Sequence, residues 1–557
     1  MEWNAMPEKI KNRYNWKNGV LSLGKTDLSN YFIKVQMLLK NPEQTKEYFK
    51  VLYIVGEEEK KYEGIIDLSN FIKEELPFPL CNECIDYKRT SRNELLNIAK
   101  DQRSLIIAQG WYINTIGWQA INENWFYCAG ERLFNPRNVN NIIVDSKLKE
   151  GYKIRCENSK NRVDTIEEIK KLICLGNTPL NICLLYLTMG LLRTLFSYAD
   201  VPPKFLLYIF GDTGKYKTTL AKYFFDIYSS GRGNSFACAD LTSSESALWR
   251  KISDFKDCVF ILDDLSPGIN ARETSRKEGT VNDFIRTVAN CEERNIKSGN
   301  RLQGDSVGCV IAITAEYMIK TESIVNRTLI LDLNKHSLNN VLNFISKNPL
   351  LINSYVCHFL NWSCDNDSRI IQYIQDEWKI YRDTIYNNEI SPRVRDSIKM
   401  LEISSRFLNL FLKSSNGDMT GVMSFIHHSL SEVAKDEENM LRGIRSYNQS
   451  YDIAEEIVKL LNSGTIQLTN SVFKGGNPPA YIYNGYLYIQ PSYLLECLES
   501  VITNIKLTKN MISAYLIKKH ILNKDNSAST KKGKGGSRYY LINLEQLADE
   551  ARIEIEI

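Results

Sequence analysis

Residues 205–221 constrain the fold of this chain more than any other stretch. An apolar run at residues 205–210 leads into Gly211, a short polar loop follows, and Lys217 and Thr218 open a helical pattern. A strand, a glycine-bearing turn and a helix in this order form a phosphate-binding loop, where backbone N–H groups, a lysine and a Mg²⁺-ligating hydroxyl meet the phosphates. The N-terminal dipole of the helix adds to this attraction. The sequence therefore predicts an α/β fold, with a parallel sheet and flanking helices.

Only one register of the pattern Gly-x-x-x-x-Gly-Lys-Ser/Thr fits this loop. Gly211, Lys217 and Thr218 match, and Tyr216 stands where the second glycine is expected. Placing the lysine at Lys215 would put Tyr216 at the metal-binding hydroxyl, which removes the chemistry. The alternative is a surface turn with chance lysines. We expect the loop to bind ATP through Gly211, Asp212, Thr213, Gly214, Lys217, Thr218 and Thr219, with Thr218 as a ligand of Mg²⁺.

A second apolar run, at residues 258–262, ends in two carboxylates, Asp263 and Asp264. A buried parallel strand would carry them to the sheet edge where ligands bind. Asp263 would then hold Mg²⁺ through water, and Asp264 would polarise the attacking water. The alternative is an ordinary strand end followed by an acidic turn. Because a phosphate loop lies upstream, the catalytic interpretation is favoured.

Length and composition favour a multidomain protein without a membrane span. A chain of 557 residues, 43% hydrophobic and 24% charged, can bury several ordinary cores. No apolar run approaches the length of about 20 residues that a membrane span needs, and the first residues lack the regions of a signal peptide. We expect a cytoplasmic protein with no membrane partner. The net charge of +4 means that any nucleic-acid surface is local.

The thirteen cysteines are scattered and do not suggest a disulfide framework. Cys81 and Cys84 are the only close pair, and no second pair or histidine cluster lies nearby in the sequence. A structural zinc site normally needs four ligands. Whether a distant cysteine such as Cys128 completes a site stays open.

Two further regions have recognisable patterns. Aromatic alternation from Gly110 to Tyr127 predicts a small β-rich region, whose rings either pack in a core or form a stacking platform for bases. Helical patterns follow at residues 165–173 and 180–196, and Pro202 with Pro203 marks a boundary before the phosphate loop.

The order of motifs after the loop resembles the core of the AAA+ ATPases. After the acidic strand come a helix at residues 281–291, a polar stretch at 292–304, a strand ending near Thr314, and the turn from Ser323 to Arg327 before another strand. This turn and the spacing are most similar to the minichromosome maintenance (MCM) helicase branch. From about residue 110 to the C-terminus, the chain looks like the MCM-like ATPases of phages, plasmids and staphylococcal cassette chromosomes.

The resemblance implies roles for residues at the matching positions. Thr314 would sense the γ-phosphate, and Arg327 would be an arginine finger that reaches the nucleotide of the neighbouring subunit. Arg393 would be the second sensor arginine of a helical lid, and Arg395 is the alternative candidate for that position. Because a finger that acts on a neighbour needs a closed ring, we expect a homo-oligomer, a hexamer in this family.

Four features depart from the family's pattern. Tyr216 replaces a glycine, Asp264 replaces a glutamate and Thr314 replaces an asparagine. Because the shorter carboxylate of Asp264 would reach the attacking water less easily, slow turnover is expected. The segment between Gly231 and Cys258 is also too short for the large helix-2 insertion of cellular MCM proteins. Translocation would then depend on the loop before the strand of Thr314, with Lys297 and Arg301 as DNA contacts. The alternative is that both are ordinary solvated charges.

The C-terminal segment predicts a winged helix. An amphipathic helix at residues 507–519 precedes a basic, glycine-rich turn that enters a strand at Arg538. A helix followed by a hairpin can place the helix in a DNA groove and the wing on phosphates. The alternative is a basic linker between unrelated elements. The expected DNA contacts are Lys518, Lys519, Lys531, Lys532, Lys534 and Arg538.

Together these features predict five regions. They are an α+β N-terminal region of unknown role (1–109), a β-rich and helical lead-in (110–200), an AAA+ core (201–345), a helical lid (346–445) and a winged-helix domain (446–557). The expected function is an ATP-dependent helicase or translocase on single- and double-stranded DNA, a replicative helicase or initiator of a mobile element. The alternatives are an AAA+ protein remodeller and a non-motor ATP switch in phage defence. No aromatic residue lies between Asn295 and Gln303, although protein-threading pores usually have one.

Overall fold

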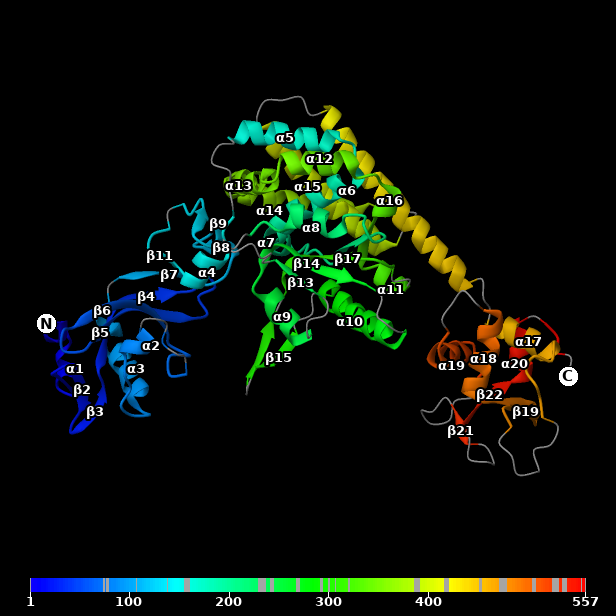
Figure 1. Cartoon of the computed structure of the whole chain (residues 1–557), viewed down its shortest axis with the longest axis horizontal. Helices are drawn as coiled ribbons and strands as arrows, with labels where there is room; N and C mark the ends of the chain where they lie inside the picture. The colour runs from blue at the N-terminus through cyan, green and yellow to red at the C-terminus, as the bar shows by residue number, and fades with distance from the viewer. Residues whose placement is uncertain are drawn as a thin grey trace. The chain divides into compact units, whose positions relative to one another are not determined.

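The computed structural model forms two compact units, Met1–Glu438 and Asn439–Ile557 (Figure 1). It describes residues 2–73, 76, 80–106, 108–137, 139–154, 161–228, 237–240, 245–266, 271–290, 294–298, 301–305, 307–318, 321–384, 391–414, 420–449, 453–469, 478–502, 507–522, 530–532, 538–551 and 553–555. Within these residues, no helix combines the length and the apolar character that a membrane span requires.

The first unit contains the predicted parallel sheet. Its strands lie in the order β13-β14-β17-β12-β18, and every neighbouring pair is parallel. Both faces of such a sheet are covered, so its strands need nearly continuous apolar sequences. The central strands β12 and β17 have such sequences. The bounds are β12 (Leu206–Phe210), β13 (Cys238–Asp240), β14 (Lys256–Leu265), β17 (Gly308–Ala315) and β18 (Thr328–Asp332).

Helices flank this sheet, as Figure 1 shows. All fourteen residues of α6 (Thr178–Leu191) are buried, and α6 packs against β14 and α8 (Lys217–Phe225). The predicted boundary at Pro202 and Pro203 therefore does not separate α6 from the sheet, because an apolar helix buried on all sides belongs to the core it fills. The other helices against the sheet are α7 (Arg193–Tyr198), α9 (Glu245–Ser253), α10 (Ala271–Ala289) and α11 (Glu322–Val325). α5 (Arg162–Cys174) packs on α6 and α13 (Leu351–Cys364) instead.

Residues 339–449 are mostly helical. α13 packs against α5, and α15 packs against α6. Tyr355 of α13 and Thr188 of α6 share a hydrogen bond, with their hydroxyl oxygens 2.7 Å apart. The helices are α12 (Asn339–Lys347), α13 (Leu351–Cys364), α14 (Asp367–Asp383), α15 (Pro392–Lys413) and α16 (Thr420–Gln449).

The N-terminal part of this unit is an α+β structure around a second sheet, in the order β11-β7-β4-β5-β6. The predicted boundary after residue 109 divides this sheet, because β7 pairs in parallel with β4 and then with β11. Alternation along one strand does not reveal its distant pairing partner, so the sequence could not place this boundary. The strands are β4 (Tyr31–Lys40), β5 (Glu47–Val55), β6 (Lys60–Asp67), β7 (Gln109–Ile113) and β11 (Ile142–Val144).

Two small antiparallel sheets accompany it. One is formed by β1 (Tyr14–Lys17), β2 (Val20–Leu23) and β3 (Thr26–Ser29), and the other by β8 (Gly117–Ile121), β9 (Asn124–Ala129) and β10 (Arg132–Phe134). α3 (Ser91–Asp101) packs against β4.

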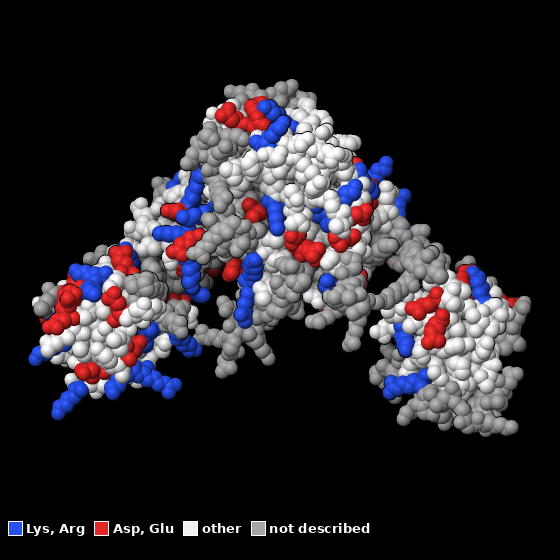
Figure 2. Space-filling model, viewed as in Figure 1, with Lys and Arg blue, Asp and Glu red and all other residues white. Residues whose placement is uncertain are grey.

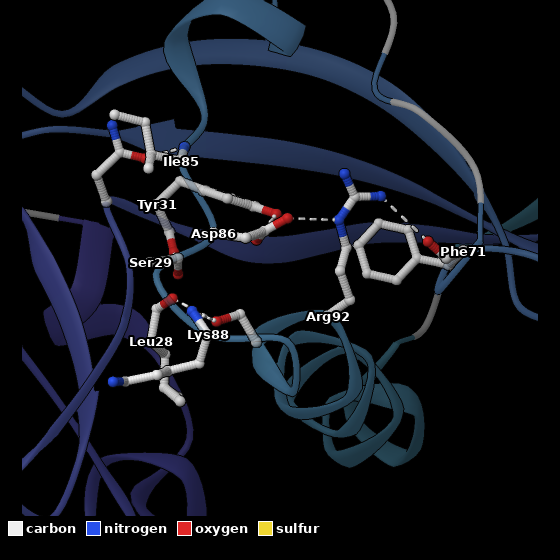
Figure 3. Close-up of polar contacts among 10 residues, drawn as sticks. Leu28, Ser29, Tyr31, Phe71, Ile85, Asp86, Lys88 and Arg92 are labelled. Atoms are coloured by element: carbon white, nitrogen blue, oxygen red, sulfur yellow. Dashed lines mark hydrogen bonds and ion pairs between the residues drawn. The ribbon is translucent and has the colours of Figure 1, made fainter.

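A polar network fixes the segment between α2 (Leu80–Glu83) and α3, as Figure 3 shows. The carboxylate of Asp86 accepts hydrogen bonds from the Tyr31 hydroxyl and from Nε of Arg92, both at 2.8 Å. Arg92 also donates to the carbonyl oxygen of Phe71 at 3.2 Å. Burial, with Asp86 adjacent, raises the pKa of Tyr31, so its hydroxyl stays a donor. This network has a structural role: it anchors the segment to the sheet.

Most aromatic residues of β8 and β9 pack in the interior rather than forming an open platform, and Trp125 is half-buried. Trp118 and Tyr127 are fully buried. Trp118 donates to the carbonyl oxygen of Leu191, and Tyr127 donates to that of Asp257, each at 2.8 Å. The carboxylate of Asp257 accepts in turn from the N–H of Trp118 at 2.8 Å and of Thr194 at 2.6 Å. Core packing, one of the two predicted alternatives, is confirmed for these rings.

The second unit is a smaller α+β structure with an antiparallel sheet in the order β19-β20-β22-β21. Its apolar core is formed by one face of this sheet and by the helices. A helix followed by a hairpin occurs where the sequence predicts it, at α19 and β21–β22. The elements are α17 (Ile453–Asn462), β19 (Ala480–Tyr483), β20 (Tyr486–Ile489), α18 (Pro491–Val501), α19 (Lys509–Lys518), β21 (Lys531–Lys532), β22 (Arg538–Asn543) and α20 (Leu544–Ala551).

Candidate nucleotide site

The phosphate loop connects the end of β12 to the start of α8. The ammonium group of Lys217 donates hydrogen bonds to the carbonyl oxygens of Gly211 at 2.8 Å and Asp212 at 3.0 Å. It therefore lies over the loop that precedes it. This is the location that a lysine needs if it is to meet phosphates held by the N–H groups of the same loop.

Tyr216 takes the backbone conformation that the missing glycine would take. It precedes α8 with φ of 56° and ψ of 26°, in the left-handed region. A residue with a Cβ atom adopts this conformation at a cost of about 1–2 kcal/mol. The Tyr216 side chain is 50% exposed, so it does not fill the loop. The departure from the pattern thus changes the residue but keeps the turn.

Three side chains meet at Asp263, at the carboxyl edge of the sheet. Its Oδ1 atom accepts from the hydroxyl of Thr218 at 2.8 Å and from that of Thr314 at 2.6 Å. The ammonium group of Lys222 lies 3.8 Å from Oδ2. Hydroxyl and carboxylate oxygens are ligands that suit Mg²⁺. Thr218 and Asp263, the pair predicted from the sequence, are therefore placed to share one ion.

Asp264 lies on a bulge at the end of β14. Leu262 is paired with Ile313 and Leu265 with Ala315, so two aspartates oppose the single residue Thr314. Asp264 has φ of 66°, and its N–H donates to the Thr314 hydroxyl at 3.0 Å. A bulge redirects the side chains of the strand that carries it. The exposed side chain of Asp264 therefore reaches the cleft beside the loop.

Two adjoining clefts flank the loop. One, of about 280 Å³, is lined by Thr213, Gly214, Tyr216, Lys217, Thr218, Thr219, Asp264, Thr314, Ala315 and Glu316. The other, of about 520 Å³, is lined by residues 213–216 and 334–339. Seven of the predicted site residues line the first cleft, and Asp263 contacts two of them.

Sequence reasoning missed three residues near the loop. Glu316 accepts a hydrogen bond from the Thr213 hydroxyl at 2.8 Å. Asn334 accepts from the N–H of Asp212 at 3.0 Å, and Lys222 faces Asp263. Glu316 and Asn334 each follow the end of a strand, β17 and β18, and this position at the carboxyl edge was the available signal.

Arg327 lies at the opposite edge of the sheet from the loop. It precedes β18, and its carbonyl oxygen accepts from the N–H of Leu206 at the start of β12. Its guanidinium donates to the carbonyl oxygen of Ser323 at 2.6 Å. The five residues of β12 separate it from Gly211, a distance of about 17 Å at strand rise. Arg393, exposed in the first turn of α15, lines neither cleft.

The predicted DNA contacts are only partly described. Lys297 and Arg301 lie in an antiparallel hairpin, β15 (Arg294–Ser298) and β16 (Arg301–Asp305), and their side chains lie outside the described part of the structure. The same holds for the side chains of Lys518, Lys531 and Lys532, and for the whole of Lys534.

Two of the C-terminal basic residues are described in full. Arg538 is exposed at the start of β22. Lys519 forms an ion pair with Glu550, so its charge is largely compensated. Over the face drawn in Figure 2, the described lysines and arginines alternate with acidic residues and form no single large basic patch.

The described cysteines do not form a metal site. Within the described residues, no group of three or more His, Cys, Asp or Glu could hold a metal ion. Burial raises the pKa of the Cys84 thiol to about 12, which disfavours the thiolate that zinc binds. Ten described cysteines, Cys81 and Cys84 among them, are free, and Cys357 is disulfide-bonded.

Comparison with known proteins supports the fold. No protein-family model matches the sequence, and no curated protein matches it. Among solved structures, the active helicase Cch of SCCmec type IV aligns over 97% of this chain and 99% of its own, with a TM-score of 0.54 and 12% identity. Two structures of JCV helicase, one with a bound acetamide compound, align over 44% of this chain and 74% of theirs. Their identities are 13% and 14% and their TM-score is 0.21, too low to carry an argument. The chain thus has the fold of the first helicase over nearly its whole length.

Proposed function

We propose that this chain is an ATP-driven DNA helicase or translocase of the MCM-like AAA+ type. The observation that carries the proposal is the meeting of Thr218, Asp263 and Thr314 beside the loop of Lys217. One hydroxyl from the loop helix and one carboxylate from β14 supply oxygen ligands for Mg²⁺, while Lys217 supplies the cation for the β- and γ-phosphates.

The chemistry is phosphoryl transfer to water. Mg²⁺, when bound, would neutralise charge on the β- and γ-phosphate oxygens. The loop N–H groups and Lys217 would hold the phosphates, and a carboxylate of the cleft would orient the attacking water, for which the sequence predicts Asp264. Thr314, between Asp263 and the Asp264 N–H, would detect the γ-phosphate.

The location of Arg327 supports a ring of identical subunits. At the edge of the sheet opposite its own loop, Arg327 is far from the nucleotide of its own chain but could serve a neighbour. Heterologous contacts of this kind close into rings. We infer a hexamer. Arg393 lines neither cleft of its own chain, so as the second sensor arginine it would also have to reach the nucleotide from elsewhere in the ring.

DNA would be the substrate of the motor, as in a replicative helicase or initiator of a mobile element. The β15–β16 hairpin, with Lys297 and Arg301, projects a two-stranded ribbon that suits a pore. In the C-terminal unit, α19 and the hairpin β21–β22 occur in the order of a winged helix, with Arg538 exposed on the wing.

The test is the rate of ATP hydrolysis with and without single-stranded DNA, on full-length protein whose mass is determined by light scattering. We expect a hexameric mass and hydrolysis that DNA accelerates several-fold. Stimulation by unfolded polypeptide instead of DNA would favour a protein remodeller. Slow hydrolysis that neither polymer changes would favour a non-motor switch.

A further inference from the structure

We propose that Glu316, rather than Asp264, is the carboxylate that orients the attacking water. This inference rests on the proposed ATPase activity and specifies a residue that the sequence motif does not contain. Glu316 directly follows β17 and lines the smaller cleft together with Lys217 and Thr218.

The order of strands places Glu316 closer than Asp264 to the end of β12, where the phosphate loop begins. β17 is the immediate neighbour of β12, the strand that leads into the loop, whereas β14 is separated from β12 by β17. Adjacent strands lie about 4.8 Å apart, so Asp264 starts about one strand spacing farther from the end of β12, where the loop begins. An aspartate side chain is also one methylene shorter than a glutamate.

Hydrogen bonds within the cleft agree with this order. The Glu316 carboxylate already contacts the loop, since it accepts a hydrogen bond from the Thr213 hydroxyl at 2.8 Å. Its backbone is held in place by a hydrogen bond from its N–H to the carbonyl oxygen of Leu265 at 3.0 Å. Asp264 instead lies on a bulge, in the left-handed backbone conformation, with its N–H held by Thr314.

The first of the two acids at the end of β14, Asp263, has a different task. Asp263 is bonded to Thr218 and Thr314 and is placed for the metal. In hydrolysis, the water oxygen forms a new bond to the γ-phosphorus as the bond to the β–γ bridging oxygen breaks, and ADP leaves. The proton released by the water passes to the Glu316 carboxylate and then to solvent.

The experiment compares Glu316→Gln, Thr213→Val and Asp264→Asn with wild type in the full-length chain. Affinity is measured with a fluorescent ATP analogue, and turnover with saturating ATP. The amide oxygen of Gln can still accept the Thr213 hydroxyl, so Glu316→Gln removes the charge but keeps the hydrogen bond. Thr213→Val removes the hydrogen bond but keeps the charge.

We expect Glu316→Gln to bind the analogue within about threefold of wild type and to turn over about 100-fold or more slowly, the usual size of a general-base effect. Thr213 belongs to the phosphate loop, so Thr213→Val should also lose turnover, but by about tenfold, the range of one hydrogen bond, and less than Glu316→Gln. Asp264→Asn should retain more turnover than Glu316→Gln.

Three results would overturn the inference. The first is a turnover of Glu316→Gln equal to or above that of wild type. The second is an equal loss of turnover in Glu316→Gln and Thr213→Val, which would mean that Glu316 acts only through Thr213. The third is a larger loss of turnover in Asp264→Asn than in Glu316→Gln. A wild-type chain that does not hydrolyse ATP would contradict the proposed function itself. That result is distinct from a hydrolysing chain in which Glu316→Gln is unimpaired.

Discussion

Lys215 and Lys217 lie two residues apart in one loop but have different surroundings. Lys217 begins α8 and donates to the carbonyl oxygens of Gly211 and Asp212. Lys215 lines the larger cleft, away from the meeting point of Thr218 and Asp263. The two lysines therefore provide a matched pair for testing the register of the motif.

We expect Lys217→Ala to abolish hydrolysis, because the β- and γ-phosphates lose their cation, while Lys215→Ala remains active. ATP turnover of the two variants, measured side by side with their nucleotide affinities, checks this. Comparable losses in both variants would show that the register is wrong.

At the scale of residues, site residues within a contiguous motif could be predicted from the sequence. Site residues that folding brings in from distant segments could not. Thr218 and Asp263 could be paired from their motifs, and they are hydrogen-bonded. Glu316 and Asn334 reach the loop from segments about 100 residues downstream, so no local spacing links them to it. The left-handed backbone of Tyr216 also needed the structure, since tyrosine rarely adopts it.

At the scale of elements, α16 is joined to β18 by a buried carboxyl group. Glu437 is fully buried, and its Oε1 accepts a hydrogen bond from the N–H of Ile330. Its Oε2 is buried without a hydrogen-bond partner among the described residues. Burial raises the pKa of Glu437 to about 8, and the neighbouring Asp436 adds to the shift. Asp436 itself pairs with Lys335 at 2.9 Å.

This pKa makes the stability of the first unit depend on pH. The folded state holds a proton on Glu437 that the unfolded chain releases near its ordinary pKa of 4.5. The contribution of this proton to the free energy of unfolding is therefore fully present below about pH 4.5. Between that pH and about pH 8 the contribution declines by about 1.4 kcal/mol per pH unit.

We expect Glu437→Gln to remove this component, so that its unfolding temperature declines less than that of wild type between pH 5 and about 8. Scanning calorimetry across this range measures it. Asp436→Asn should keep most of the pH dependence, because burial is the largest cause of the shift and Asp436 a smaller one, and the ion pair that it breaks is partly exposed and worth under about 1 kcal/mol. Parallel pH profiles for wild type and Glu437→Gln would contradict the prediction.

Strands and helices with strong patterns were predictable, whereas their partners were not. The strand ending in Asp264 and the helix after Lys217 occur where the sequence indicates them. That β7 completes the N-terminal sheet, and that α6 is buried against the parallel sheet, depends on packing between distant segments. Periodicity reports which face of an element is apolar, but not what covers it.

At the scale of the whole molecule, the position of Arg327 leads to a prediction about the ring. Arg327→Ala should bind ATP but hydrolyse it about 10³-fold more slowly, as for other arginine fingers. Mixing it with Lys217→Ala should restore activity, because some interfaces then combine an intact loop with an intact arginine. With random mixing, about a quarter of the interfaces do so.

Turnover of the mixture is compared with that of each variant alone, after light scattering has established that rings form. Wild type mixed with each variant provides the control for simple dilution. Absence of recovery in demonstrably mixed rings would argue against an arginine that acts on the neighbour.

The division into two compact units leads to the last prediction, which separates DNA recruitment from ATP chemistry. Changing Lys531, Lys532, Lys534 and Arg538 to Ala should weaken binding to duplex DNA. It should also reduce the log–log salt slope by about 0.9 for each DNA phosphate that the wing no longer neutralises. Basal ATP hydrolysis should persist, because Lys217, Asp263 and Glu316 all lie in the first unit. Lys519→Ala is the matched control: its charge is already paired with Glu550, so the slope should change little. An unchanged slope in the four-residue variant would remove the DNA-binding role from this wing, even if hydrolysis remains intact.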